Sequence, residues 1–116
     1  MAKVIDLDYR KSEKYLEGLL IKRTKYLGCI CLKYSNGNET GFPDRMVLLP
    51  NGGIIWVEIK SAGKKLRPIQ EARKKQLEAI GHEVYVVDSV ASLDTVIDII
   101  HSRIDKEIVI APCEED

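Results

Sequence analysis

Two carboxylates and a lysine stand out in the middle of the sequence because of their spacing. Asp44 directly follows Pro43, and Glu58 and Lys60 lie two residues apart at the end of the apolar run 54–60. Converging carboxylates bind hard cations such as Mg²⁺ through oxygen. A metal ion held in this way activates water and neutralises the charge that develops on a phosphate, and a nearby lysine stabilises the transition state as a point charge. These residue types therefore indicate metal-assisted phosphodiester chemistry.

A β-hairpin is predicted to bring these residues together. The segments Arg45–Leu49 and Ile54–Lys60 have the composition of strands, and the turn-forming residues 50–53 (PNGG) separate them. Side chains alternate between the faces of a strand, so Glu58 and Lys60 share one face. Three apolar residues are expected on the opposite, core-facing side: Ile55, Val57 and Ile59.

The residues on this face of the strand also allow interpretations other than catalysis. Glu58 and Lys60 could be an ordinary charge pair on a solvated sheet surface. Trp56 lies on their face and could stack on a nucleic-acid base, although core packing is the more common use of a single tryptophan. We expect Trp56 to belong to the core.

The remaining segments complete an α/β pattern. Leucines recur at helical spacing between Ser12 and Leu27, with Ser12 as the N-cap and Gly28 ending the helix. The order of predicted elements is helix, three strands, helix, strand, helix, which indicates a mixed central sheet flanked by helices. The other predicted elements are a strand at 29–34, a helix from Pro68 to about Ile80, a strand at 83–88, a helix capped by Ser92, and a short strand or tail at 108–111.

Length and composition predict one domain, residues 1–116, inside a reducing cytoplasm. Of the three cysteines, none forms a CxxC pair, which argues against a disulfide framework and a structural zinc site. No apolar run approaches the roughly 20 residues of a membrane helix, and the N-terminus has no secretory h-region. We expect no membrane partner.

A basic segment follows Glu58 even though the 18 basic and 18 acidic residues of the whole chain balance. Residues 60–75 hold seven lysines and arginines against Glu71 alone. Such a stripe beside an acidic centre suits a phosphate backbone. The alternative is a solvated helix face. The candidate DNA contacts in this segment are Lys64, Lys65 and Arg67.

The ordered set of motifs resembles the VRR-NUC (virus-type replication-repair nuclease) family within the PD-(D/E)xK, restriction-endonuclease-like superfamily. The matching residues, from about Leu16 to Ser89, are Gly41-Phe42-Pro43-Asp44-Arg45, the Asn51-Gly52-Gly53 turn, Trp56-Val57-Glu58-Ile59-Lys60, Gln70, Leu77, Gly81 and Tyr85-Val86-Val87-Asp88-Ser89. The resemblance implies a restriction-endonuclease-like fold. It also implies a DNA nuclease that depends on Mg²⁺ or Mn²⁺, with Asp44 and Glu58 as metal ligands and Lys60 assisting the attacking water.

The resemblance implies further site residues. A glutamate on the first helix would be a third carboxylate, and the alignment selects Glu17, with Glu13 one helical turn earlier as the rival. Gln70 would orient groups near the metal, with a plain helix-capping role as the alternative. The carbonyl of Ile59 would be a further metal ligand by the same resemblance, and Lys33 is a weaker candidate for a phosphate contact.

By the same resemblance, the chain is a phage or bacterial protein that acts as a homodimer on branched DNA such as four-way junctions. The apolar stripe of the last helix, or residues 108–111, would supply the dimer interface. Two alternatives remain. One is a catalytically silent DNA-binding or assembly module on the same fold, and the other is a nickase, exonuclease or sequence-specific endonuclease.

Overall fold

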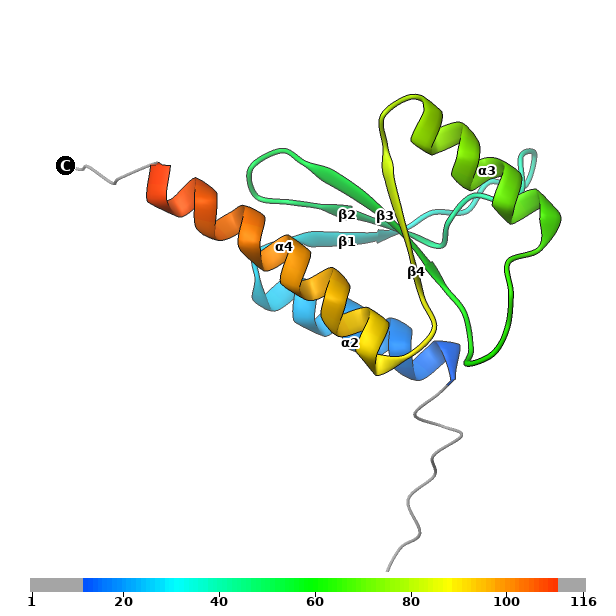
Figure 1. Cartoon of the computed structure of the whole chain (residues 1–116), viewed down its shortest axis with the longest axis horizontal. Helices are drawn as coiled ribbons and strands as arrows, with labels where there is room; N and C mark the ends of the chain where they lie inside the picture. Colours follow the sequence, from blue (N-terminus) through cyan, green and yellow to red (C-terminus); the bar gives the residue numbers. More distant parts are fainter. Residues whose placement is uncertain (1–11, 111–116) are drawn as a thin grey trace, which may run out of the picture.

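The computed structural model describes residues 12–110, and of residues 105–110 it describes the backbone alone. Seven elements follow one another in the predicted order (Figure 1). They are α2 (Glu13–Tyr26), β1 (Ile30–Lys33), β2 (Arg45–Leu48), β3 (Ile54–Ile59), α3 (Pro68–Ala79), β4 (Glu83–Val87) and α4 (Val90–Ile110). Within this part of the chain, no helix has the length and apolar character required to cross a membrane.

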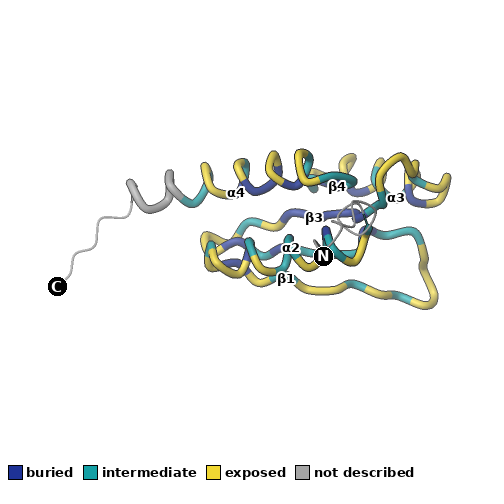
Figure 2. The backbone as a smooth tube through the Cα atoms, turned by 90° about the horizontal axis from the view of Figure 1, so that it is seen from below, coloured by how far each residue is buried: buried dark blue, intermediate teal, exposed yellow. Residues whose placement is uncertain are grey.

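The four strands form one mixed sheet in the order β1-β2-β3-β4. The first three strands pair antiparallel, and β4 runs parallel to β3 after the crossover through α3. The predicted hairpin is confirmed: its loop is closed by a hydrogen bond from Leu49 N to Gly53 O at 2.8 Å. Strand β3 is central, and Figure 2 shows it buried along most of its length. The α/β fold with a mixed sheet is confirmed.

The helices divide between the two faces of the sheet. Helices α2 and α4 lie side by side on one face (Figure 1) and close the main core. The inward side chains of β3, Ile55, Val57 and Ile59, belong to this core as predicted. Helix α3 covers part of the other face, where Trp56 packs with Leu77 and Val84. The expectation that Trp56 is a core residue is therefore confirmed.

The ends of the helices follow from local chemistry. The Ser12 hydroxyl accepts a hydrogen bond from Tyr15 N at 3.1 Å, so Ser12 is the N-cap of α2 as predicted. Pro68 occupies the first turn of α3, where its missing N–H is not needed. Gly28 and Gly81, at φ +85° and +98°, follow α2 and α3 with a backbone conformation that favours glycine.

The predictions for the last helix were partly wrong. It begins at Val90, and the Ser89 hydroxyl accepts from Ser92 N at 3.0 Å, so Ser89 and not Ser92 fills the capping position. Residues 108–110 continue the helix rather than form a strand or tail, and Ala111 lies outside the described residues. The apolar stripe of this helix packs in the core, where Leu93, Val96, Ile97 and Ile100 are buried. It therefore does not form an open dimer surface.

Candidate active site

The hairpin places Asp44 next to Glu58. Arg45 pairs with Val57 across β2 and β3, so Asp44 lies opposite Glu58 one step further along the ladder. The Asp44 carboxylate accepts a hydrogen bond from Ile59 N at 2.9 Å, which fixes it against the end of β3. The register thus brings together two of the predicted metal ligands and the main chain of Ile59.

Glu58 is the centre of this arrangement and is only 3% exposed. Its carboxylate accepts a hydrogen bond from Gln70 Nε2 at 2.8 Å. The interpretation of Glu58 and Lys60 as a charge pair on a solvated face is therefore wrong for Glu58. A buried carboxylate that lies beside another carboxylate is unfavourable in isolation, and a bound cation would offset that cost.

Gln70 makes one hydrogen bond at the start of α3 and one to Glu58, as the two roles considered for it would each require. Its side-chain oxygen accepts from Arg67 N at 2.8 Å and so satisfies a free N–H at the start of α3. Because the oxygen is engaged in this way, the amide NH₂ group faces Glu58 and donates to it. Gln70 therefore fixes the carboxylate of Glu58 relative to α3.

The charges of the site act on one another. Burial raises the pKa of Glu58 to about 7, and the negative charge of Asp44 adds to the rise, while Lys60 and Arg67 oppose it. Burial also raises the pKa of Asp44, against the lowering effect of the hydrogen bond from Ile59. Lys60 lowers the pKa of both carboxyl groups, which indicates that its ammonium lies near both.

The helix carboxylates occupy different environments. Glu17, the selected candidate, accepts a hydrogen bond from Arg45 Nε at 2.7 Å in a partly buried ion pair. Its negative charge contributes to the raised pKa of Asp44. The charge of Glu13 contributes to the raised pKa of both Asp44 and Glu58. Arg45 therefore engages Glu17, whose charge acts more strongly on Asp44 than that of Glu13 does, and Glu13 acts on Glu58 as well.

The predicted DNA contacts separate into two groups. Lys64, Lys65 and Arg67 are exposed in the loop between β3 and α3. Arg67 donates from its N–H to Gln70, and its charge lowers the pKa of Glu58. Lys33 is exposed on β1 opposite Arg45, so it leaves the sheet from the α2 side and not from the face of Glu58. Arg67 therefore adjoins the site, whereas Lys33 does not share its face.

A divalent cation fits the donor set of this site. The described residues contain no group of three or more His, Cys, Asp or Glu side chains arranged around one metal position. Mg²⁺ does not require one, because it is commonly held by one or two carboxylates and completes its shell with water and substrate phosphate. Asp44 and Glu58 are both oxygen donors, and the mutual repulsion of their charges would be relieved by a cation.

Contacts between residues 40–42 and α3, which the sequence did not predict, support the site. Arg73 of α3 donates from Nε to Thr40 O at 2.9 Å, and its guanidinium lies 4.8 Å from the centre of the Phe42 ring. Gly41, at φ +91°, lies so close to α3 that an added Cβ would be 2.6 Å from Ile69 Cγ1. These contacts join the segment before Asp44 to the helix that carries Gln70. In the sequence, the only indication of these contacts is the Gly41-Phe42 pair next to Pro43.

The fold, with two carboxylates and a lysine at the end of its central hairpin, defines a restriction-endonuclease-like domain. A solved structure named "VRR_NUC domain" matches with a TM-score of 0.71 at 31% identity, over 74% of this chain and 94% of that one. The chain belongs to the VRR_NUC family of nucleases. A second structure, "VRR_NUC domain protein", shares the fold at 18% identity with a TM-score of 0.59, over 78% of this chain and 85% of that one.

A phage protein supports the same assignment. The protein named "Putative nuclease p44", from Acyrthosiphon pisum secondary endosymbiont phage 1, is 42% identical over 77 residues. The match covers 66% of this chain and 83% of that protein. The sequence matches no family model. The resemblance inferred from the motifs is therefore confirmed by overall sequence and fold.

The raised pKa of Glu58 predicts that the metal-free protein loses stability as the pH rises. A carboxyl group whose pKa is higher in the folded state stabilises the fold while it is protonated, and this contribution is lost between its unfolded pKa of about 4.5 and its folded pKa of about 7. In EDTA, we expect the Tm to fall by on the order of 10 °C from about pH 5 to pH 8. Thermal denaturation at each pH measures this effect.

Glu58→Gln is the control for this pH dependence. Its neutral amide keeps the shape and can still accept from Gln70, so its Tm should change much less over the same pH range. Other groups, such as Glu83, whose hydrogen bond from Arg103 lowers its pKa, act equally in both proteins. Parallel pH profiles for the two proteins would contradict the assignment.

Proposed function

We propose that this nuclease-family chain hydrolyses phosphodiester bonds of DNA with Mg²⁺ or Mn²⁺ bound by Asp44 and Glu58, and that branched DNA is its substrate. The observation that carries the proposal is Glu58, a carboxylate that is 3% exposed, held by Gln70 and adjacent to Asp44. A buried pair of oxygen donors beside a lysine has the chemistry required for this reaction. The main chain of Ile59, which contacts Asp44, is a further candidate ligand through its carbonyl.

Each residue of the site would have a different role in hydrolysis. A divalent ion, when bound, supplies Lewis-acid chemistry at the phosphate. Lys60 would donate hydrogen bonds to the attacking water or to a phosphate oxygen and compensate negative charge in the transition state. Gln70 would keep Glu58 in the orientation that binds the cation. Lys64, Lys65 and Arg67 would hold the phosphate backbone beside the site.

A third carboxylate from α2 completes the proposed ligand set. Glu17 is engaged by Arg45, whereas Glu13 acts on the pKa of both Asp44 and Glu58. We therefore favour Glu13 as the residue that approaches the bound cation, directly or through water. Arg45 would then serve to keep Glu17 away from the metal.

We propose that the chain forms a homodimer. One copy of this domain offers one hairpin site, whereas resolution of a branched DNA requires cuts in two strands. The mass in solution, measured by light scattering, should then be about twice the 13.1 kDa of the chain. A monomeric mass at working concentration would contradict the dimer and leave the hydrolytic proposal intact.

The decisive experiment combines cleavage with metal binding. Linear, flapped and four-way-junction DNA are incubated with Mg²⁺ or Mn²⁺, and Mn²⁺ affinity is measured by calorimetry. We expect wild-type protein to cut a branched substrate in either metal and to be inactive in EDTA. Asp44→Asn should bind Mn²⁺ at least about ten-fold more weakly and lose cleavage.

Two further variants test the helix carboxylate. Glu13→Gln should weaken Mn²⁺ binding more than Glu17→Gln does, because Arg45 already neutralises Glu17. The reverse order would restore Glu17 as the ligand. A folded wild-type protein that binds DNA but neither binds Mn²⁺ nor cuts any substrate would exclude the hydrolytic function and leave a DNA-binding module.

A further inference from the structure

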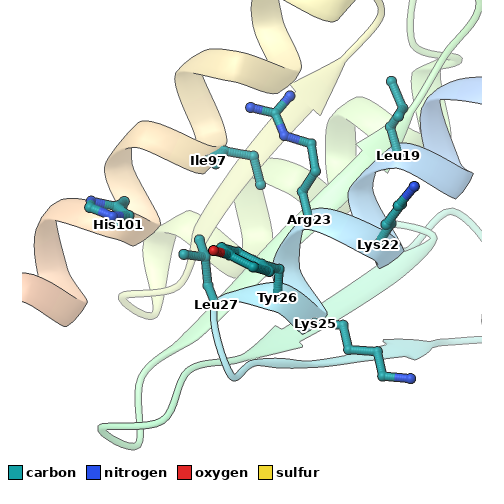
Figure 3. A pocket seen from close by; sticks show the side chains of 8 residues that line it. All are labelled: Leu19, Lys22, Arg23, Lys25, Tyr26, Leu27, Ile97 and His101. Atoms are coloured by element: carbon teal, nitrogen blue, oxygen red, sulfur yellow. The ribbon is translucent and has the colours of Figure 1, made fainter.

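An open apolar hollow lies between α2 and α4, at the end of α2 away from Glu13. Its volume is about 700 Å³, and Leu19, Leu27 and Ile97 form apolar parts of its lining. Figure 3 shows the ring of Tyr26 lying beside Leu27, with Ile97 across from it on α4. Tyr26 is 90% exposed. A large exposed aromatic ring beside apolar side chains offers a surface on which a planar ligand could stack.

The charge around this hollow is positive on the α2 side. The segment Ile21–Tyr26 (IKRTKY) carries three cations and no acid. Arg23 is engaged by Asp94 of α4 at 2.6 Å. Lys22 and Lys25 are exposed, and both line the hollow; Figure 3 shows their ammonium groups extending away from the ring of Tyr26, on the side opposite Leu27. An anionic ligand with an apolar, planar part would complement this combination of charge and shape.

We propose that the hollow binds an unpaired nucleotide of the DNA substrate, with its base against Tyr26 and its phosphates against Lys22 and Lys25. Aromatic rings combined with cations are the usual means of holding single-stranded nucleic acid without reading its sequence. The inference rests on the proposed function, because it assumes a DNA substrate at Asp44 and Glu58. It adds a second contact that selects DNA with an unpaired strand.

The distance from the catalytic centre suits a continuous strand. Thirteen residues separate Glu13 from Tyr26 along α2, which corresponds to about 20 Å at 1.5 Å per residue. At the 3.4 Å rise per nucleotide of a strand stacked as in duplex DNA, this span equals about six nucleotide steps, and an unpaired strand that is more extended would need fewer. A strand that leaves the active site along α2 would reach the hollow once it extends by about that length.

The test measures binding without cleavage. The probe is a fluorescein-labelled duplex with a single-stranded arm longer than about six nucleotides, in EDTA, and the matched probe is the blunt duplex. Fluorescence anisotropy gives the two dissociation constants. We expect Tyr26→Ala to weaken binding of the armed duplex by at least about five-fold and to leave the blunt duplex within about two-fold. Tyr26→Phe, which keeps the ring, should bind like wild type.

The contribution of the two lysines can be measured from the salt dependence of binding. Lys22→Ala with Lys25→Ala should reduce the slope of log affinity against log salt by about 1.4 on the armed duplex, since each single-strand phosphate contact contributes about 0.7. Ile80→Ala is the matched control for removal of an exposed large side chain, because Ile80 is 74% exposed at the end of α3. It should leave both affinities unchanged.

The outcomes separate this site from the catalytic proposal. Equal losses on armed and blunt duplexes, or no loss with Tyr26→Ala, would overturn the hollow as a site for unpaired nucleotides even if wild-type protein cuts DNA normally. A change in oligomeric mass without a change in DNA affinity would overturn it in favour of a protein contact. Failure of wild-type protein to bind or cut any DNA would instead remove the proposed function itself.

Discussion

Lys60→Ala should reduce cleavage by roughly 10²- to 10³-fold while the protein remains folded. The charge of Lys60 lowers the pKa of both Asp44 and Glu58, and under the proposed function its ammonium would lie beside the reacting phosphate. Its removal takes away a positive charge from the transition state. Because the same charge repels a bound cation, Mn²⁺ affinity should stay equal or become tighter. Single-turnover cleavage at saturating Mn²⁺ measures the catalytic loss.

Lys64→Ala is the control for this experiment. Lys64 is an exposed cation of the same loop, so its loss should weaken DNA binding only a few-fold, mainly at low salt. A loss of cleavage with Lys64→Ala as large as that with Lys60→Ala would show that loop charge, and not the position of Lys60, limits the reaction. A Lys60→Ala protein that cuts at the wild-type rate would remove this residue from the mechanism.

Gly41→Ala should destabilise the fold by about 2–4 kcal/mol, the largest stability effect that we expect from one methyl group. Gly41 has a φ of +91°, which an alanine rarely adopts. The added Cβ would also lie 2.6 Å from Ile69 Cγ1 and 2.9 Å from Ile69 O. The second contact is with backbone, so the first turn of α3 must move. The Tm should fall by about 10 °C or more, as measured by thermal denaturation.

The same substitution should affect activity below its Tm. Ile69 precedes Gln70, so a displaced helix start moves the amide that holds Glu58. Weaker Mn²⁺ binding in folded Gly41→Ala protein would follow. Gly18→Ala is the control, because nothing lies within 4 Å of its added Cβ in the middle of α2. It should raise stability by about 0.5–1 kcal/mol. Equal Tm values for the two variants would contradict the argument.

The hairpin site could be predicted from the sequence because its geometry is local. The turn at 50–53 sets the register of β2 and β3, and strand alternation then assigns Glu58 and Lys60 to one face. Gln70 could be placed near Glu58 only through the family resemblance. Its double hydrogen bonding, to Arg67 N and to Glu58, depends on how α3 docks on the sheet.

Other features depend on tertiary contacts that no sequence pattern encodes. The ion pair between Arg45 and Glu17 joins residues from a strand and a helix, and it engages one of the two candidate α2 carboxylates. The contact of Gly41 with Ile69 is likewise a packing event between distant segments. The start of α4 was misplaced because Ser89 and Ser92 are equally good capping residues, and only their mutual hydrogen bonding distinguishes them.

The confinement of Asp44, Glu58 and Lys60 to one hairpin has a consequence for how the molecule acquires its activity. Hairpins of neighbouring strands form early in folding because little loop entropy opposes them, whereas the parallel pairing of β3 with β4 must await the crossover through α3. The carboxylates can therefore meet before Gln70 and the loop cations arrive. Under the proposed function, a chain still folding would have its two carboxylates near one another before the proposed DNA-binding cations were in place, and cleavage would begin only after α3 had docked on the sheet.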